Sequence, residues 1–327
     1  MSISQLKVLE QQPPAPAANE PQAAPQAALH EERWLLGLPS LGKFLHFVED
    51  AAPVEARERS AELVDAWRAA NDYYQGLETS ERGIANEARA LPPDEATAAL
   101  FERVRAHAHY RRAFDTLPTE FAMVPLDLLI VFQKHVSWTF VERLAERWSG
   151  PPGAEALFDL CMPLERPAAS VEVRRLGARR YVFRCESMDF RYHDPVLLQP
   201  EQLERFEASG AVAGIVGLVI GFGCNFLNAI RVGNRLMLNN GYHRACALRA
   251  LGVTHAPCII QSATRTEELG LVAKREVAQD AEFYFESARP PLLKDFFDPR
   301  IRRTILTRPR IRQIEVSLEI QDFVLAR

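Results

Sequence analysis

The chain has 327 residues, of which 47% are hydrophobic and 25% are charged, proportions typical of a folded globular protein. Its net charge of −4 argues against nucleic acid as a partner, because nucleic-acid-binding proteins usually carry a basic excess. The longest apolar run, 211–222, is too short to span a bilayer, and the N-terminus lacks the pattern of a secretory signal. We therefore expect a cytoplasmic protein with no membrane partner.

The cysteines predict neither a disulfide framework nor a metal site. They are five in number, widely spaced and without a Cys-x-x-Cys pair. Free thiols in a reducing cytosol are the simplest interpretation.

The first part of the chain predicts an arm followed by a helical domain. Residues 1–29 are rich in Pro, Gln and Ala, so we expect a disordered arm. Residues 30–150 show apolar stripes at helical spacing, including a predicted helix over 94–114. We favour helix for most of 124–148. A strand at 128–132 is the alternative, because a short apolar run does not decide between the two.

A linker with the sequence Ser-Gly-Pro-Pro-Gly at 149–153 introduces a predicted α/β domain over 151–261. β-forming residues predict a strand at 180–185. The glycine-rich apolar segment 210–223 is expected to be buried.

A polar cluster follows the predicted strand at 180–185. It contains Glu186, Asp189, His193 and Asp194. A carboxylate beside a bound nucleotide can hold Mg²⁺ or take a proton from an attacking hydroxyl. These four residues are therefore candidate catalytic groups. The alternative is a polar loop in which Asp194 begins a turn.

The most informative stretch of the chain is 225–261. Gly233 and Asn234 lie between two apolar runs and predict a two-residue hairpin that joins strands at 228–232 and 235–238.

A predicted helix over 243–251 follows the hairpin, with Gly252 as its C-cap. A last apolar run at 256–260 predicts a closing strand. We expect the helix to pack on a small sheet made by these strands.

This order places five residues where a strand gives way to a helix N-terminus, whose free N–H groups favour anions. Gly241 lets a ligand approach the backbone, and Arg244 offers a fork of donors that matches phosphate oxygens. His243 adds a donor or a group that titrates near neutral pH. We predict a phosphate-binding turn made of Asn240, Gly241, Tyr242, His243 and Arg244. The alternative is a structural turn whose His and Arg cap neighbouring elements.

The stretch 225–261 resembles the core of the ParB/sulfiredoxin-like superfamily. In that family a strand pair leads into a Gly-x-His-Arg or Gly-x-Arg-Arg turn, and a helix, a Gly and a Pro precede another strand. The positions that match this pattern are Gly241, His243, Arg244, Ala247, Leu248, Gly252 and Pro257. The resemblance implies that the turn holds nucleotide phosphates.

Two activities found in the family do not suit this sequence. The sulfinic-acid reductases need a nucleophilic cysteine in the turn, where this chain has Tyr242. The DNA-partition proteins need a helix-turn-helix module after the core. Here residues 262–327 predict a helix over 267–286 and an arginine-rich extension that ends in a strand-like segment, 314–324.

The expected fold class is α+β, with a helical N-terminal region followed by a small mixed-sheet domain of the ParB/sulfiredoxin-like type. The expected function is a small-molecule enzyme, a phosphotransferase that uses ATP or another nucleotide with magnesium. In this hypothesis the 186–194 cluster faces the 241–244 turn across a cleft. The alternatives are a non-catalytic, nucleotide-responsive binding or regulatory protein, and an enzyme whose turn holds a phosphate-free anionic substrate.

Overall fold

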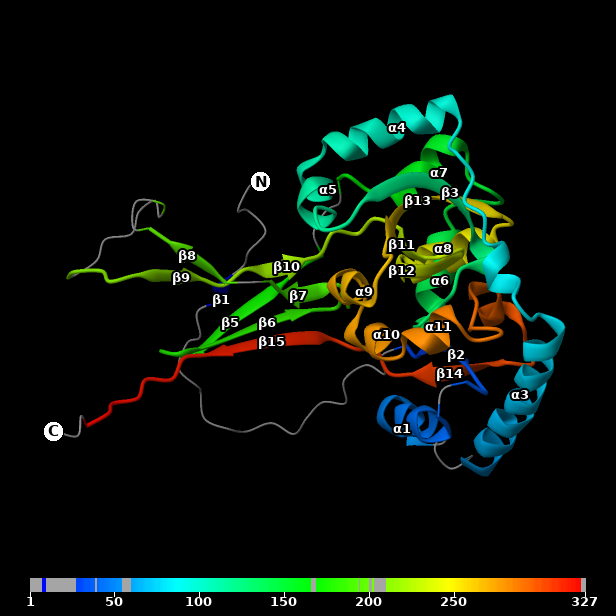
Figure 1. The fold of residues 1–327 in the computed structure, drawn as a ribbon. Helices are drawn as coiled ribbons and strands as arrows, with labels where there is room; N and C mark the ends of the chain where they lie inside the picture. The colour runs from blue at the N-terminus through cyan, green and yellow to red at the C-terminus, as the bar shows by residue number, and fades with distance from the viewer. Residues whose placement is uncertain are drawn as a thin grey trace. The chain divides into compact units, whose positions relative to one another are not determined.

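The computed structural model contains helices and a mixed sheet, which confirms the α+β class (Figure 1). Its contacts divide the chain into two compact units. Unit 1 comprises residues 1–25, 166–223 and 310–327, and unit 2 comprises residues 26–165 and 224–309. The structure describes residues 8–9, 28–38, 40–54, 60–165, 169–193, 195–199, 202 and 210–324.

A four-stranded mixed sheet lies at the centre of unit 2. Its strand order is β12-β11-β13-β3, with β11 and β13 parallel and the other two pairs antiparallel. The strands are β3 (Thr119–Pro125), β11 (Asn228–Val232), β12 (Arg235–Asn240) and β13 (His255–Ser262).

The predicted hairpin and closing strand are present in this sheet. Gly233 has a φ of 57°, in the left-handed region that a two-residue hairpin needs. The strand β13 is buried from Ala256 to Gln261, on both of its faces. This burial explains why β13 reads as a continuous apolar run without alternation.

A second sheet of unit 2 has the order β14-β2-β4, with both pairs antiparallel. Trp34 and Ile305 from this sheet share one hydrophobic cluster with Phe44 and Phe47 of the helix α1. The elements are β2 (His30–Leu35), β4 (His135–Ser137), β14 (Arg302–Thr307) and α1 (Leu41–Ala51).

The other helices of unit 2 pack around the sheets. The helix α6 packs against α8, and α7 packs against β13 (Figure 1). The α-helices are α3 (Ser60–Ser80), α4 (Glu95–Ala106), α5 (Ala108–Ala113), α6 (Trp138–Ala145), α7 (Ala154–Cys161), α8 (Tyr242–Ala250), α9 (Thr266–Val272), α10 (Arg275–Gln279) and α11 (Ala281–Phe285). The 3-10 helices are η1 (Ile84–Glu87), η2 (Leu126–Leu128) and η4 (Leu293–Phe297).

Unit 1 consists of one four-stranded sheet and two short ribbons. The sheet has the order β1-β5-β6-β15, and the ribbons pair β10 with β7 and β8 with β9. The strands are β1 (Val8–Leu9), β5 (Glu172–Gly177), β6 (Arg180–Cys185), β7 (Phe190–Tyr192), β8 (Val196–Leu198), β9 (Ile215–Gly217), β10 (Ile220–Phe222) and β15 (Arg312–Ser317).

The predicted domain boundaries differ from these units. The region 30–150 is not purely helical, because it contains β2, β3 and β4. β3 pairs with β13, so residues on both sides of the predicted boundary at 150 share one sheet. The predicted linker at 149–153 lies within unit 2.

Most of 124–148 is also not helical, which corrects the prediction. β3 ends at Pro125 and the only α-helix in this stretch is α6. Between them Ile130 lies in extended backbone, where its amide donates to the Leu236 carbonyl and its carbonyl accepts from the Leu238 amide. Hydrogen bonds to another segment therefore determine the conformation of this apolar run, and its local helix propensity does not. The alternative of a strand at 128–132 was closer.

Three further predictions need correction. The segment 210–223 is largely uncovered, with Val216 65% exposed, because its strands lie in two-stranded ribbons. The predicted helix over 267–286 is divided into α9, α10 and α11. The predicted strand at 314–324 starts at Arg312 and ends at Ser317. The predicted arm 1–29 lies outside the described residues apart from 8–9 and 28–29, and Val8–Leu9 form β1.

Among the residues that the structure describes, no helix combines the length and the apolar composition needed to cross a membrane.

Candidate functional site

Arg244 in the predicted phosphate turn is bound to backbone carbonyls. It is 4% exposed, and its Nη1 donates to the carbonyl oxygens of Leu160 at 3.2 Å, Cys161 at 3.1 Å and Asn225 at 2.6 Å. Its Nη2 donates to Asn225 Oδ1 at 2.8 Å. These bonds tie α8 to the end of α7 and to the segment before β11. The guanidinium is therefore committed to the fold, and this geometry does not offer it to a phosphate.

Gly241 and Asn240 support the same junction, between α8 and the segment before β11. Gly241 has a φ of 103°, and a Cβ there would lie 3.1 Å from Leu227 Cγ. The Asn240 side-chain amide donates to the Phe226 carbonyl at 3.2 Å and to the Cys224 carbonyl at 3.5 Å. Asparagine amides commonly satisfy backbone groups at strand ends in this way. Both residues therefore fit the structural interpretation of the turn.

His243 is neutral near pH 7 in this structure. Its ring lies edge-on to Phe140, with 5.0 Å between the ring centroids. Burial lowers the pKa of His243 to about 4. The nearby Glu32 carboxylate opposes the shift, and the positive charges of Arg244 and His135 add to it. The lowered pKa argues against titration of His243 near neutral pH, and its predicted role as a donor to a ligand stays a prediction.

Tyr242 connects the turn to a neighbouring segment. Its hydroxyl donates to the Leu238 carbonyl at 2.8 Å and accepts from the Phe132 amide at 3.0 Å. The Tyr242 and Phe132 rings also pack edge to face, with 5.5 Å between centroids. Tyr242 is thus a structural support for the backbone around Phe132.

The predicted catalytic cluster belongs to unit 1, whereas the turn belongs to unit 2. Asp189 forms an ion pair with Arg191, and the His193 amide donates to the Val219 carbonyl at 2.8 Å. Glu186 is exposed and Asp194 lies outside the described residues. A site shared by this cluster and the turn stays a prediction.

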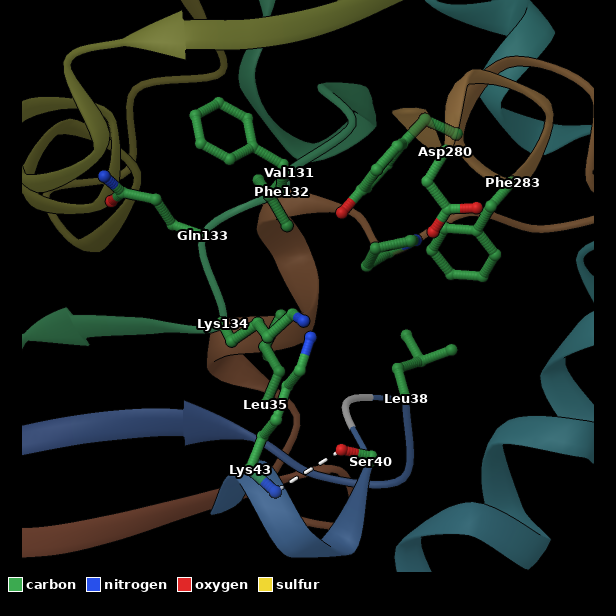
Figure 2. A pocket seen from close by; sticks show the side chains of 12 residues that line it. Leu35, Leu38, Ser40, Lys43, Val131, Phe132, Gln133, Lys134, Asp280 and Phe283 are labelled. Atoms are coloured by element: carbon green, nitrogen blue, oxygen red, sulfur yellow. Dashed lines mark hydrogen bonds between the residues drawn. The ribbon is translucent and has the colours of Figure 1, made fainter. Parts of the chain in front are cut away.

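A cavity in unit 2 lies elsewhere and has a volume of about 350 Å³ (Figure 2). It is bordered by the end of β2, the start of α1, the segment 131–134 and the helix α11. Its lining residues are Leu35, Leu38, Ser40, Lys43, Val131, Phe132, Gln133, Lys134, Asp280, Phe283, Tyr284 and Pro291.

The segment that forms one wall of the cavity is fixed by its backbone. The Val131 amide donates to the Pro291 carbonyl, the Phe132 amide donates to Tyr242, and the Lys134 carbonyl accepts from the Leu35 amide at 2.8 Å. The next residue, His135, stacks on Trp34 with a centroid separation of 5.1 Å. Because side chains alternate along extended backbone, Lys134 points away from that cluster and into the cavity.

Two lysine side chains meet inside the cavity. Figure 2 shows the side-chain nitrogens of Lys43 and Lys134 ending beside each other, and the Lys43 amine is near enough to lower the pKa of Lys134. Lys43 lies in the first turn of α1, whose positive dipole end adds to the potential of the two amines. Neither lysine forms a salt bridge with a described residue. The cavity therefore concentrates positive charge.

Burial and the charges around the cavity shift the pKa values of two groups in its lining. Burial lowers the pKa of Lys134 below its usual 10.5, and the Lys43 charge lowers it further, while Glu276 and Asp280 act in the opposite direction. Burial also raises the pKa of Tyr284 to about 12, with a further rise from Asp280 and Glu276. The Tyr284 hydroxyl is consequently a proton donor at neutral pH.

The sequence analysis missed these residues, although the composition contains a signal for them. Only five of the 39 basic residues are lysines, and the other 34 are arginines. Lys43 and Lys134 line the cavity, and Lys274 lies 5.0 Å from the centroid of Phe132 in its wall. Arginine is always charged, whereas lysine can lose its proton. Three of the five lysines of the chain therefore lie in or beside the cavity.

Comparisons with protein-family models, with curated proteins and with solved structures find no match for this chain. Membership of the ParB/sulfiredoxin-like superfamily is therefore a prediction based on the 225–261 motif. Within the described part of the chain, no group of three or more His, Cys, Asp or Glu side chains is arranged to hold a metal ion.

Proposed function

We propose that the protein is a small-molecule enzyme that binds an organic oxyanion in the cavity between α1 and α11. The observation that supports this proposal is the meeting of Lys43 and Lys134 inside the cavity without a salt-bridge partner among the described residues. Two neighbouring amines repel each other when both are charged, and an anion bound between them offsets this repulsion.

The charge balance and the lining define the class of ligand. When both amines carry their protons, the two lysines and the single carboxylate of Asp280 give the cavity lining a net charge of one positive unit. This charge favours a carboxylate or a phosphate monoester as ligand. Val131, Phe132 and Phe283 provide apolar contacts for a short carbon chain. A cavity of about 350 Å³ is within the size range of small-molecule sites.

Binding of such ligands can be measured by calorimetry and by the rise of the melting temperature with inorganic phosphate, acetate, pyruvate and a nucleoside triphosphate, each with and without Mg²⁺. Lys43→Met and Lys134→Met should each weaken anion binding by roughly 1.5–3 kcal/mol, about a tenfold to hundredfold loss of affinity. Without anion, Lys43→Met should melt at a higher temperature than wild type, because the repulsion is gone. Arg68→Met is the charge-matched control, since Arg68 is exposed on α3.

Equal anion affinity in wild type and both lysine variants would contradict the proposal. The same experiment tests the nucleotide-dependent phosphotransferase predicted from the motif, together with its alternative, a nucleotide-responsive binding protein. Stabilisation by nucleotide and Mg²⁺ that survives both lysine substitutions would indicate a nucleotide site away from this cavity.

We also propose a cytoplasmic location. The five cysteines are all free thiols, and reducing compartments keep thiols in this state.

A further inference from the structure

We infer that Lys134 is a nucleophilic amine that forms an imine with the carbonyl carbon of a small oxo acid bound in the cavity. This inference rests on the proposed anion site and adds to it a substrate class and a covalent step.

The position of Lys134 suits a nucleophile. Its backbone is held by the hydrogen bond from Leu35, and its side chain enters a cavity with the partly apolar walls Val131 and Phe283. The neighbouring amine of Lys43 is the second requirement, because a lysine beside another cation is activated as a nucleophile.

The contact between the two amines points in the same direction. An ammonium group has donors only and carries a charge, so two adjacent amines favour the loss of one proton. Lys134 is the more buried of the two, since Lys43 is an exposed residue and Lys134 is half-buried. Lys134 is therefore the amine that loses its proton more readily, in agreement with the lowering of its pKa by burial and by the Lys43 charge.

The reaction is a condensation in which water leaves. The Lys134 nitrogen lone pair forms a bond to the carbonyl carbon, and the carbonyl oxygen takes a proton to give a carbinolamine. The C–O bond then breaks, the oxygen leaves as water after a second protonation, and the nitrogen loses its protons to give the imine. Tyr284 lines the cavity with a raised hydroxyl pKa and is the candidate donor for the departing oxygen.

The second amine explains the choice of an oxo acid. When Lys134 loses its proton to react, Lys43 keeps its charge and can contact a carboxylate of the substrate. An acid with its carbonyl one or two carbons from the carboxylate can contact both amines, because these lie side by side. A phosphate monoester without a carbonyl group can bind the same amines but cannot form the imine.

The first experiment uses an uncharged probe, so that it does not depend on anion binding. Pentane-2,4-dione condenses with neutral amines to a stable enaminone, and mass spectrometry of peptides reports the extent of labelling at each lysine. Near pH 7 we expect Lys134 to react faster than Lys274 and Lys294, since a lowered pKa leaves a larger neutral fraction of its amine. Lys294, which forms an ion pair with Glu81, is an internal control.

Variants of the neighbouring groups test the cause of this reactivity. Lys43→Met should slow labelling of Lys134 at pH 7, because the charge that lowers the pKa of Lys134 is gone, whereas Lys43→Arg keeps the charge and should largely keep the rate. The carboxylates that oppose Lys43 are those of Glu276 and Asp280, so Asp280→Asn should speed labelling. Tyr284 is neutral in this range and contributes no charge.

The second experiment adds sodium cyanoborohydride to the full-length protein with pyruvate or acetoacetate. Reduction of the imine should give a secondary amine at Lys134, seen as a mass increase that Lys134→Met abolishes. The inference is overturned if Lys134 reacts with the diketone no faster than Lys274, or if neither oxo acid gives an adduct at Lys134. Labelling by the diketone with no binding of acetate or phosphate would instead contradict the anion site alone.

Discussion

At the scale of single residues, the Gly-Tyr-His-Arg turn shows that side chains suited to phosphate binding can instead bind backbone carbonyls within the fold. Arg244 donates hydrogen bonds to the carbonyls of three buried or half-buried residues, and Asn240 donates to two more. Removing such a donor leaves acceptors without partners in a region that water does not reach.

Arg244→Ala should therefore destabilise the protein by about 2–5 kcal/mol, because several buried carbonyls lose their donor. Urea unfolding measures this loss, and Arg68→Ala on the exposed face of α3 should change stability by no more than about 0.5 kcal/mol. A folded Arg244→Ala variant of normal stability that has lost nucleotide affinity would restore the phosphate role.

His243 predicts a specific pH dependence of stability. Its pKa is about 4 in the folded protein and 6.5 when it is unperturbed, so between these values the unfolded chain binds more protons. Stability should fall as the pH drops from 6.5 to 4, by up to about 3 kcal/mol from this residue.

The measurement is the free energy of unfolding in urea at several pH values for wild type and His243→Gln. The substituted protein should lose this part of the pH dependence and keep the remainder. Parallel curves for the two proteins between pH 4 and pH 7 would show that His243 is solvated.

At the scale of elements, the segment 129–134 links the turn to the cavity. It has extended backbone without a continuous partner strand among the described residues. Its bonds include those to β2, to β12, to Pro291 and to the Tyr242 hydroxyl. The position of Lys134 thus depends on a side chain at the N-terminus of α8.

Tyr242→Phe should weaken this connection, because the buried Phe132 amide loses its acceptor. We expect a loss of about 1–2 kcal/mol in stability and faster hydrogen exchange of the Phe132 amide. Tyr73→Phe is the matched control, since the Tyr73 hydroxyl bonds to Asp298 away from this segment. Unchanged exchange at Phe132 in Tyr242→Phe would contradict the supporting role.

At the scale of the whole molecule, unit 2 should fold without unit 1. Both hydrophobic clusters described in unit 2 are made from its own residues. The chain leaves unit 2 after Glu165 and returns at Cys224, and the Leu227 amide donates to the Cys161 carbonyl at 2.8 Å beside these two points.

A variant that begins at Gln26, ends at Pro309 and has a short Gly-Ser linker in place of 166–223 should unfold cooperatively and keep its anion-induced rise in melting temperature. A short loop between neighbouring ends has a small closure entropy. Calorimetry and thermal melting provide the measurement. A molten variant without a cooperative transition would show that unit 2 depends on unit 1.

The sequence predicted local features well where turn chemistry and short-range pattern decide the structure. The hairpin at Gly233, the helix α8 and the strand β13 were all foreseen. The segment 129–134 was not, because hydrogen bonds to residues about 100 positions away override its apolar pattern. The lysine pair was not foreseen either, since Lys43 and Lys134 are far apart in sequence and only tertiary structure brings them together.

The hydrogen bond between Leu227 and Cys161, close to where the chain leaves and re-enters unit 2, also makes this point a natural splice site. A foreign domain whose own ends lie close together could be exchanged for 166–223 without stretching α7 or β11. Equally, a circular permutant with its new ends inside 166–223 would leave the Arg244 contacts to Leu160 and Asn225 in place. A fluorescent reporter spliced in at this junction would sit next to the residues that Arg244 joins, and would sense any loosening of them.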